Sequence, residues 1–130
     1  MSDYVKEKVL RIPLERITVL NPKEFENSLT EVQKGLFDYG TVGKFQFAPT
    51  EKHYIDYVLF RSYGEECGDF GIHRALTENE KNKYLPIFKQ ICPQINMDDV
   101  RLVEFCWYNC CEAPDYYDGI SDDDDFYKEV

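Results

Sequence analysis

FQFAPTEKHYIDYVLFRSY, residues 45–63, has the pattern of two strands joined by a turn. In its first part Phe45 and Phe47 alternate with polar residues, which is typical of a strand with one buried face. Residues 49–52 begin with proline and predict a turn. Residues 54–63 are rich in aromatic and β-branched side chains, which favour strands. Two such runs on either side of a short turn predict an antiparallel hairpin.

Further strands are expected before and after this hairpin. Residues 9–20 are mostly apolar and predict a first strand region, in which Pro13 marks an edge or a bulge. Residues 100–108 predict the last strong strand, with alternate side chains from Val103 to Trp107 sharing one face.

Two segments predict helices. In the first, Asn21 is a cap residue, Pro22 takes the first helical position, and an apolar stripe of one continuous helix follows at Phe25, Leu29, Val32 and Leu36. In the second, Thr77 and Glu80 have the spacing of a capping box. The predicted buried face of that helix comprises Tyr84, Leu85, Phe88 and Ile91. Pro86 lies inside the segment and predicts either a kink or two short helices.

This order of elements predicts an α+β fold, with a mostly antiparallel sheet of about four strands and two helices packed on one face. At 130 residues the chain is expected to form a single domain over residues 1–111. Residues 112–130 form an acidic, tyrosine-rich C-terminal segment, either part of the same domain or a tail.

The C-terminal segment holds most of the net charge. Residues 112–130 carry eight carboxylates against Lys128 alone, a net charge of −7 out of −10 for the whole chain. Nucleic-acid binding depends on Lys and Arg that neutralise phosphates, so we expect no direct binding of nucleic acid. The N-terminus lacks the apolar core of a signal peptide, and no run approaches the roughly 18 apolar residues of a membrane span. These features predict a cytoplasmic protein without a membrane partner, in which thiols stay reduced.

Five cysteines raise the question of a metal. Cys106 and Cys110 have the spacing of a zinc knuckle, Cys111 could replace either of them, and Cys67 lies in a glycine-rich loop. We therefore predict Cys67, Cys106, Cys110 and Cys111 as candidate ligands of a structural zinc ion, with His73 as a substitute for Cys106. The alternatives are that the cysteines only pack in the core or that they perform thiol redox chemistry. No catalytic motif is present, and we predict a protein that is not an enzyme.

Carboxylates interleaved with tyrosines are the predicted docking surface. Carboxylates along a surface can imitate the phosphates of a nucleic acid and occupy a basic groove, where Arg binds them in two-pronged fashion. Tyrosine adds flat contact area at low entropic cost. The predicted partner-binding residues are Asp115, Tyr116, Tyr117, Asp118, Asp122, Asp123, Asp124 and Asp125. The alternative is an acidic tail that has no binding partner and only aids solubility.

The chain resembles anti-CRISPR proteins of phages and mobile elements, which inhibit type II CRISPR effector nucleases. The resemblance rests on the length of 130 residues, the isoelectric point near 4.6 and the closing segment VRLVEFCWYNCCEAPDYYDGISDDDDFYKEV, residues 100–130. It implies a non-enzymatic inhibitor in the cytoplasm of a host bacterial cell, which binds the nuclease–guide complex and blocks DNA loading or cleavage. Anti-CRISPR proteins share no common motif, so the resemblance transfers no functional residue.

Two other classes of protein fit the same residues. An immunity or antitoxin-like protein would also be acidic and would cap one basic nuclease. A thiol-based redox protein would instead use Cys110 and Cys111, although neighbouring carboxylates raise the pKa of a thiol.

Overall fold

A computed structural model describes residues 4–49, 53–65, 73–108 and 116–118 of the chain. Its strands are β1 (Tyr4–Pro13), β2 (Phe45–Phe47), β3 (Tyr54–Gly64), β4 (His73–Ala75), β5 (Arg101–Tyr108) and β6 (Tyr116–Asp118). Its helices are α1 (Pro22–Ser28), α2 (Glu31–Lys34) and α3 (Glu78–Lys89), with short 3-10 turns at Leu14–Arg16 and Met97–Asp99. The predicted α+β class is confirmed.

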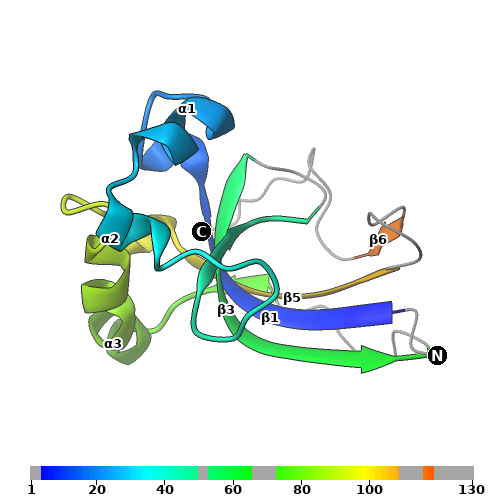
Figure 1. The fold of residues 1–130 in the computed structure, drawn as a ribbon. Coiled ribbons are helices and arrows are strands. Elements are labelled where there is room, and N and C mark those ends of the chain that lie inside the picture. Colours follow the sequence, from blue (N-terminus) through cyan, green and yellow to red (C-terminus); the bar gives the residue numbers. More distant parts are fainter. Residues whose placement is uncertain (1–3, 50–52, 66–72, 109–115, 119–130) are drawn as a thin grey trace.

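The strands form one six-stranded sheet in the order β2-β3-β1-β5-β4, and every strand pair is antiparallel. β6 also pairs with β5, so β4 and β6 share the outer side of that strand. The predicted hairpin is confirmed by the β2–β3 pairing. The helices gather at one end of the sheet, and the long strands β1, β3 and β5 extend away from them (Figure 1).

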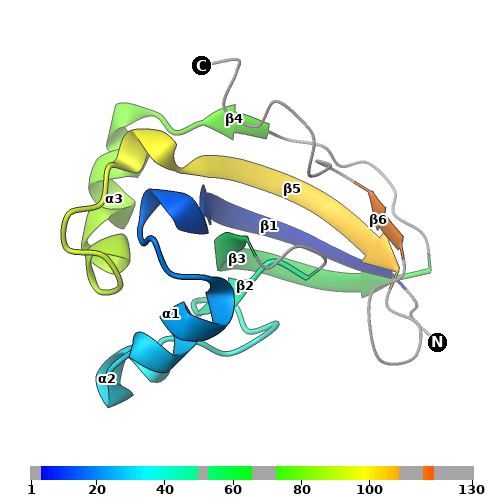
Figure 2. The same cartoon turned by 90° about the horizontal axis from the view of Figure 1, so that it is seen from above.

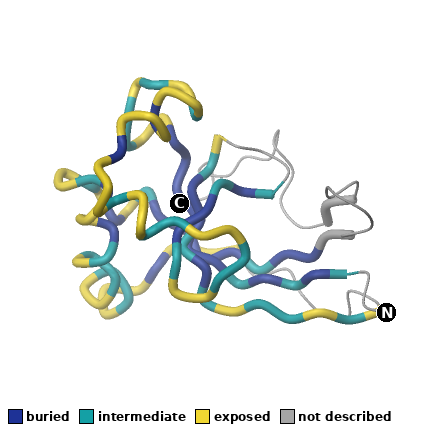
Figure 3. The backbone as a smooth tube through the Cα atoms, viewed as in Figure 1, coloured by how far each residue is buried: buried dark blue, intermediate teal, exposed yellow. Residues whose placement is uncertain are grey.

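Both faces of the sheet carry a core, because side chains alternate between the faces along β1. Leu10 and Ile12 face the helices and belong to a large cluster that includes Phe88 of α3. Val5 and Val9 face the other way and pack in a smaller cluster. Figure 3 shows the resulting pattern, with buried backbone along the middle of the sheet and exposed positions on the outer sides of the helices.

The first strand lies earlier in the sequence than predicted. β1 begins at Tyr4 and ends at Pro13, so the predicted strand over residues 9–20 is wrong after Pro13. The chain turns there, because the backbone N–H groups of Ile17 and Thr18 both bond to the carbonyl of Leu14. An apolar composition alone did not distinguish this turn from a strand.

The predicted single helix after Asn21 is in fact two short helices. The cap itself is confirmed, because the Asn21 side chain accepts a hydrogen bond from the N–H of Glu24. Leu29 then has extended backbone angles, and Thr30 begins α2 with its own capping box to Gln33. The predicted stripe therefore breaks, and Val32 is 80 % exposed.

The second predicted helix is confirmed as α3, with Thr77 and Glu80 forming the predicted capping box. The helix is a single element that includes Pro86, so the alternative of two short helices is wrong. Proline leaves the carbonyl four residues earlier without its helical N–H donor. Asn82 and Pro86 are both exposed, which allows water to satisfy that carbonyl.

Glu80 also ties β4 to α3 and makes this contact pH-dependent. Its carboxylate accepts two hydrogen bonds from Arg74, at 2.8 and 2.9 Å, and one from the N–H of Thr77. The Arg74 guanidinium is the main cause that lowers the pKa of Glu80 from 4.5 to about 2, and the Thr77 N–H adds to it. A lowered pKa stabilises the fold above pH 4.5, and this contribution is lost as the pH falls toward 2.

We expect Glu80→Gln to lower the free energy of unfolding at pH 7 by less than about 1 kcal/mol, because the ion pair is partly exposed. The difference from the parent should shrink as the pH falls from 4.5 toward 2. Urea unfolding at several pH values measures it, with Glu26→Gln on α1 as the control that keeps the parent's pH profile. A difference that stays constant down to pH 2 would contradict this account.

Within the described residues, no helix is both long enough and apolar enough to cross a membrane.

Candidate functional site

The predicted docking segment touches the sheet at one place. β6 pairs with the end of β5, so that Tyr116 lies opposite Tyr108, Tyr117 opposite Trp107 and Asp118 opposite Cys106. Part of the acidic segment therefore belongs to the same sheet as the rest of the domain. The other predicted docking residues lie outside the described residues: Asp115, Asp122, Asp123, Asp124 and Asp125.

Of the predicted zinc ligands, the structure describes Cys106 alone. Its side chain is buried on β5, and its sulfur is disulfide-bonded. This differs from the expectation of reduced thiols, and a disulfide sulfur offers no thiolate to a metal. Cys67, Cys110 and Cys111 lie outside the described residues. A zinc site that uses these cysteines therefore stays a prediction for the reduced protein.

The other candidate groups lie in different segments of the described part of the chain. His73 begins β4, is exposed and lies opposite Val103 in the strand register. Cys92 is a free, half-buried thiol that follows α3. The described residues contain no cluster of three or more His, Cys, Asp or Glu side chains placed to hold a metal ion.

A buried ionic network lies on the sheet face opposite the helices, and sequence reasoning missed it. Arg11 donates two hydrogen bonds to the carboxylate of Asp56, at 2.7 and 2.8 Å, and both side chains are buried. The Arg11 guanidinium also lies over two rings, 4.8 Å from the centroid of Phe105 and 5.4 Å from that of Tyr54. This bidentate geometry fixes β1 against β3 in a single register.

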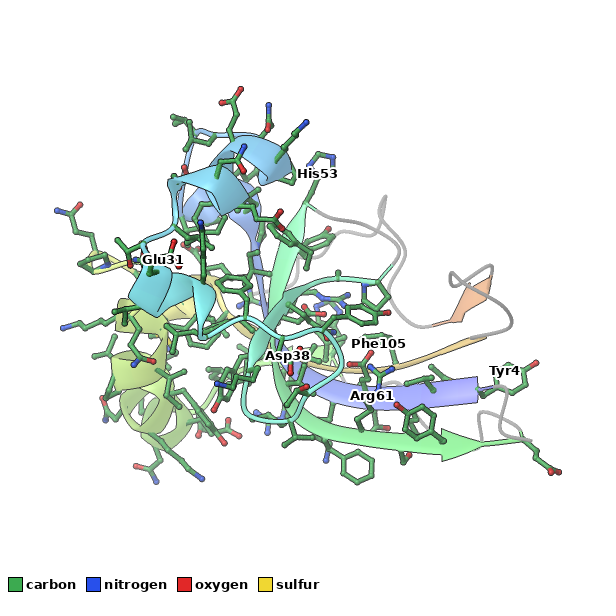
Figure 4. All side chains as sticks on the ribbon, viewed as in Figure 1. Tyr4, Glu31, Asp38, His53, Arg61 and Phe105 are labelled. Carbon is green, nitrogen blue, oxygen red and sulfur yellow. The ribbon has the colours of Figure 1, made fainter. Side chains whose placement is uncertain are left out.

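A second ion pair on the same face joins β3 to β1. Arg61 Nη1 lies 3.3 Å from the carboxylate of Glu7, which is fully buried. The same carboxylate accepts a hydrogen bond from Gln46 Nε2 at 3.1 Å. Arg61 and Phe105 project from the same side of the sheet (Figure 4), as their common register partner Glu7 requires.

Arg61 orders two exposed tyrosines. Its guanidinium lies 5.6 Å from the ring centroid of Tyr39 and 5.3 Å from that of Tyr63, and its Nε donates a 2.9 Å hydrogen bond to the Tyr63 hydroxyl. Partial burial, followed by the nearby carboxylate of Glu7, raises the pKa of Tyr39. Tyr39 therefore presents a neutral ring at the surface, and the same guanidinium contacts the rings of both tyrosines.

Gly40 allows the loop that carries Tyr39 to approach Arg61. Its φ is +75°, and a β-carbon at this position would lie 3.0 Å from the Arg61 guanidinium. Its N–H donates a 2.7 Å hydrogen bond to Gln46 Oε1, which links the loop to the network. Only glycine combines this backbone conformation with such a close approach.

The buried ion pairs hold a small set of exposed aromatic side chains in fixed positions at the surface. The buried carboxylates of Glu7 and Asp56 each face a guanidinium, and the exposed members of the cluster are the rings of Tyr39 and Tyr63. We name Tyr39, Arg61 and Tyr63 the Tyr–Arg–Tyr cluster. A sequence signal for the network exists, because Glu7 and Arg11 alternate with Val5 and Val9 on one face of the first strand.

Comparisons with protein-family models, curated proteins and solved structures found no match. The function of this chain is therefore inferred from its residues.

A surface hollow of about 360 Å³ lies beside α1 and α2, near the small end of the usual range for ligand pockets. Its lining residues are Glu26, Asn27, Leu29, Lys34 and Phe37. Glu26 and Lys34 are exposed, so this hollow lacks the buried, convergent polar groups that orient a small ligand.

Proposed function

We propose that this chain is a non-enzymatic inhibitor that binds a basic nucleic-acid-handling protein through its acidic C-terminal segment. The residues that carry the binding are Asp115, Tyr116, Tyr117, Asp118, Asp122, Asp123, Asp124 and Asp125. They occupy part of a groove that the partner uses for nucleic acid. DNA loading or cleavage by the partner is blocked as a result.

The observation that supports this proposal most is the segregation of charge along the chain. The described residues hold 13 lysines and arginines against 14 aspartates and glutamates, a net charge of −1. The whole chain carries −10, so −9 falls outside the described residues. Charges within the described part largely compensate one another, as in the pairs Arg11–Asp56, Arg61–Glu7 and Arg74–Glu80. Long-range attraction to a basic partner must therefore come mainly from the remaining segments.

The pairing of β6 with β5 gives further support. It joins Tyr116–Asp118 to the sheet, directly between two acidic stretches of the C-terminal segment. A strand attached to a sheet loses less conformational entropy on binding than a free tail does. Acidic residues next to it can therefore act from a fixed point on the domain.

The partner class comes from the resemblance to anti-CRISPR proteins, which implies a type II CRISPR effector nuclease loaded with its guide RNA. A zinc ion held by the C-terminal cysteines and Cys67 would bring the acidic residues of that loop beside the segment, and this remains part of the proposal. An immunity or antitoxin-like protein would use the same charge for one cognate nuclease. The two partner classes differ in their dependence on RNA.

We expect the chain to capture a guide-loaded type II effector in a pull-down, and RNase treatment of the effector to reduce the capture. Replacement of Asp122, Asp123, Asp124 and Asp125 by Asn should reduce capture at physiological salt by about tenfold or more, because steering charges change association rates by 10–1000-fold. The matched control removes four charges elsewhere, by Glu→Gln at the exposed residues Glu15, Glu26, Glu31 and Glu78. It should bind as the parent does.

Three outcomes would count against the proposal. Equal capture by the parent and the Asp→Asn variant would reduce the segment to a solubility device. Equal losses of capture in the Asp→Asn and Glu→Gln variants would mean that binding depends on the net charge of the protein and not on the C-terminal segment. Capture that resists RNase and needs one particular nuclease would favour the immunity-like class.

A further inference from the structure

The outer edge of β3 has no neighbouring strand beyond Val58 in the described part of the chain. β2 pairs only with Ile55–Tyr57, and residues 43–44 extend the contact as far as Val58 through hydrogen bonds of 2.8 and 3.0 Å. β3 continues to Gly64, pairing with β1 on its inner side. Figure 2 shows this far part of β3 as the outermost described strand on its side of the sheet.

Two exposed rings lie on this edge. Phe60 is 48 % exposed and Tyr63 is 59 % exposed. They lie on opposite faces, because Tyr63 pairs with Val5 and Phe60 pairs with Lys8 in the register of β1. Residues 60–64, FRSYG, contain neither lysine nor proline, which commonly protect an exposed edge. The protective features present are the β-bulge at Leu59 and the charge of Arg61, which is paired with Glu7.

We propose that this edge pairs with the same edge of a second copy of the chain, antiparallel, with Ser62 on the two-fold axis. The two sheets then form one continuous sheet across the dimer. This inference goes beyond the proposed function and does not depend on it.

The edge is self-complementary in this register. Tyr63 of one copy lies opposite Arg61 of the other, and the same two residue types already contact each other within one chain. Phe60 lies opposite Gly64, which has no side chain, so the ring can cover the glycine backbone. Each exposed ring therefore gains a partner.

The direction of the peptide groups fits the same register. Val58 points its N–H and C=O away from β1, toward residues 43–44. The β-bulge then inserts Leu59 as one extra residue on β3, which shifts the alternation by one position. As a result, the N–H and C=O groups of Tyr63 point away from β1, toward the open edge. The N–H and C=O groups of Ser62 point toward β1. Ser62 then forms a non-hydrogen-bonded pair with its copy, in which Cβ atoms approach to roughly 4.5–5.5 Å.

Charge does not oppose this pairing locally. Two Arg61 side chains come onto the same face of the joined sheet, but each lies 3.3 Å from its own Glu7. Repulsion arises at longer range, because each copy carries −10. Added salt screens that repulsion, so the dimer should tighten with salt, whereas binding of the basic partner should weaken.

Native mass and cross-linking of the full chain test the proposal. Light scattering over a dilution series should give twice the chain mass of 15.4 kDa at high concentration. Under mild oxidation Ser62→Cys should form a disulfide-linked dimer, because the Cα atoms of a non-hydrogen-bonded pair lie roughly 4.5 Å apart, within the Cα–Cα range of a disulfide. Ser28→Cys, at the exposed end of α1, is the matched control and should cross-link no more than the parent.

A second variant tests the edge without a new thiol. Phe60→Lys should raise the dimer dissociation constant by about tenfold, because the change occurs twice in a symmetric interface. Val32→Lys, at an exposed valine of α2, should leave it unchanged. A chain that stays monomeric with no specific cross-link at Ser62 would overturn the proposal, and so would a dimer insensitive to Phe60→Lys. Neither result bears on capture of the basic partner, so the proposed dimer and the proposed inhibitor function are tested independently.

Discussion

Asp56→Ala is expected to lower the free energy of unfolding by about 3–5 kcal/mol, because it removes the carboxylate that binds the buried Arg11 guanidinium in bidentate fashion. Asp56 is fully buried and accepts both hydrogen bonds of the Arg11 fork, at 2.7 and 2.8 Å. Arg11 is itself 1 % exposed, so water cannot replace the lost carboxylate without opening the sheet. Urea unfolding followed by circular dichroism measures the change.

The double variant Arg11→Met with Asp56→Leu distinguishes the contribution of the ion pair to the free energy of unfolding from that of side-chain packing. Apolar side chains of similar volume often replace a buried ion pair with little loss of stability, or with a gain. We therefore expect the double variant to be closer to the parent than Asp56→Ala is. If Asp56→Ala costs no more than a surface substitution, the ion pair is solvated and the buried network is not as described.

Phe88→Ala is expected to cost about 3–5 kcal/mol, the range for truncating a buried phenylalanine. Phe88 is the fully buried residue of α3, and its ring centroid lies 5.3 Å from that of Phe45 in β2 and 6.3 Å from that of Tyr57 in β3. Truncation removes these edge contacts and leaves a cavity between the helix and the sheet. A domain of this size is stable by about 5–15 kcal/mol, so thermal unfolding should move to a much lower temperature.

Phe60→Ala removes the same number of atoms from the exposed side of β3 and is the matched control. It should change the stability of the monomer by less than about 1 kcal/mol. Equal losses for Phe60→Ala and Phe88→Ala would contradict the placement of Phe88 in the main core and of Phe60 at the exposed margin of the sheet.

Features that depend on neighbouring residues were predictable from the sequence. The caps at Asn21 and Thr77 need only a side chain and an N–H three residues away, and both are present. The β2–β3 hairpin follows from two runs joined by a short turn. The strand β5 was placed within one residue because its apolar run is long.

Features that depend on distant residues were not predictable. The helix after Asn21 breaks because Thr30 starts a new cap while Leu29 turns into the core, and the apolar stripe alone fits one helix as well as two. β4 is three residues long and owes its conformation to β5 rather than to its own composition. The ion pairs Arg11–Asp56 and Glu7–Arg61 join residues that are 45 and 54 positions apart, so charge counts along the chain could not reveal them.

For the predicted docking residues, the structure describes the strand position of three. Tyr116, Tyr117 and Asp118 were chosen for their composition, and the strand β6 that they form had no separate signal in the sequence. The Tyr–Arg–Tyr cluster was missed, because Tyr39 reaches Arg61 only through the close approach of Gly40. Such an approach depends on one backbone angle in a loop.

The association rate constant with a guide-loaded type II effector, measured against salt concentration, shows whether the acidic C-terminal segment guides binding. The parent should show a steep decrease with salt, and the variant with Asn at residues 122–125 should show a slower rate and a flatter dependence. The variant with Gln at Glu15, Glu26, Glu31 and Glu78 should keep the parent's steep dependence. If the two variants show the same salt dependence, or if the parent's rate does not change with salt, the acidic segment does not guide binding and the account is wrong.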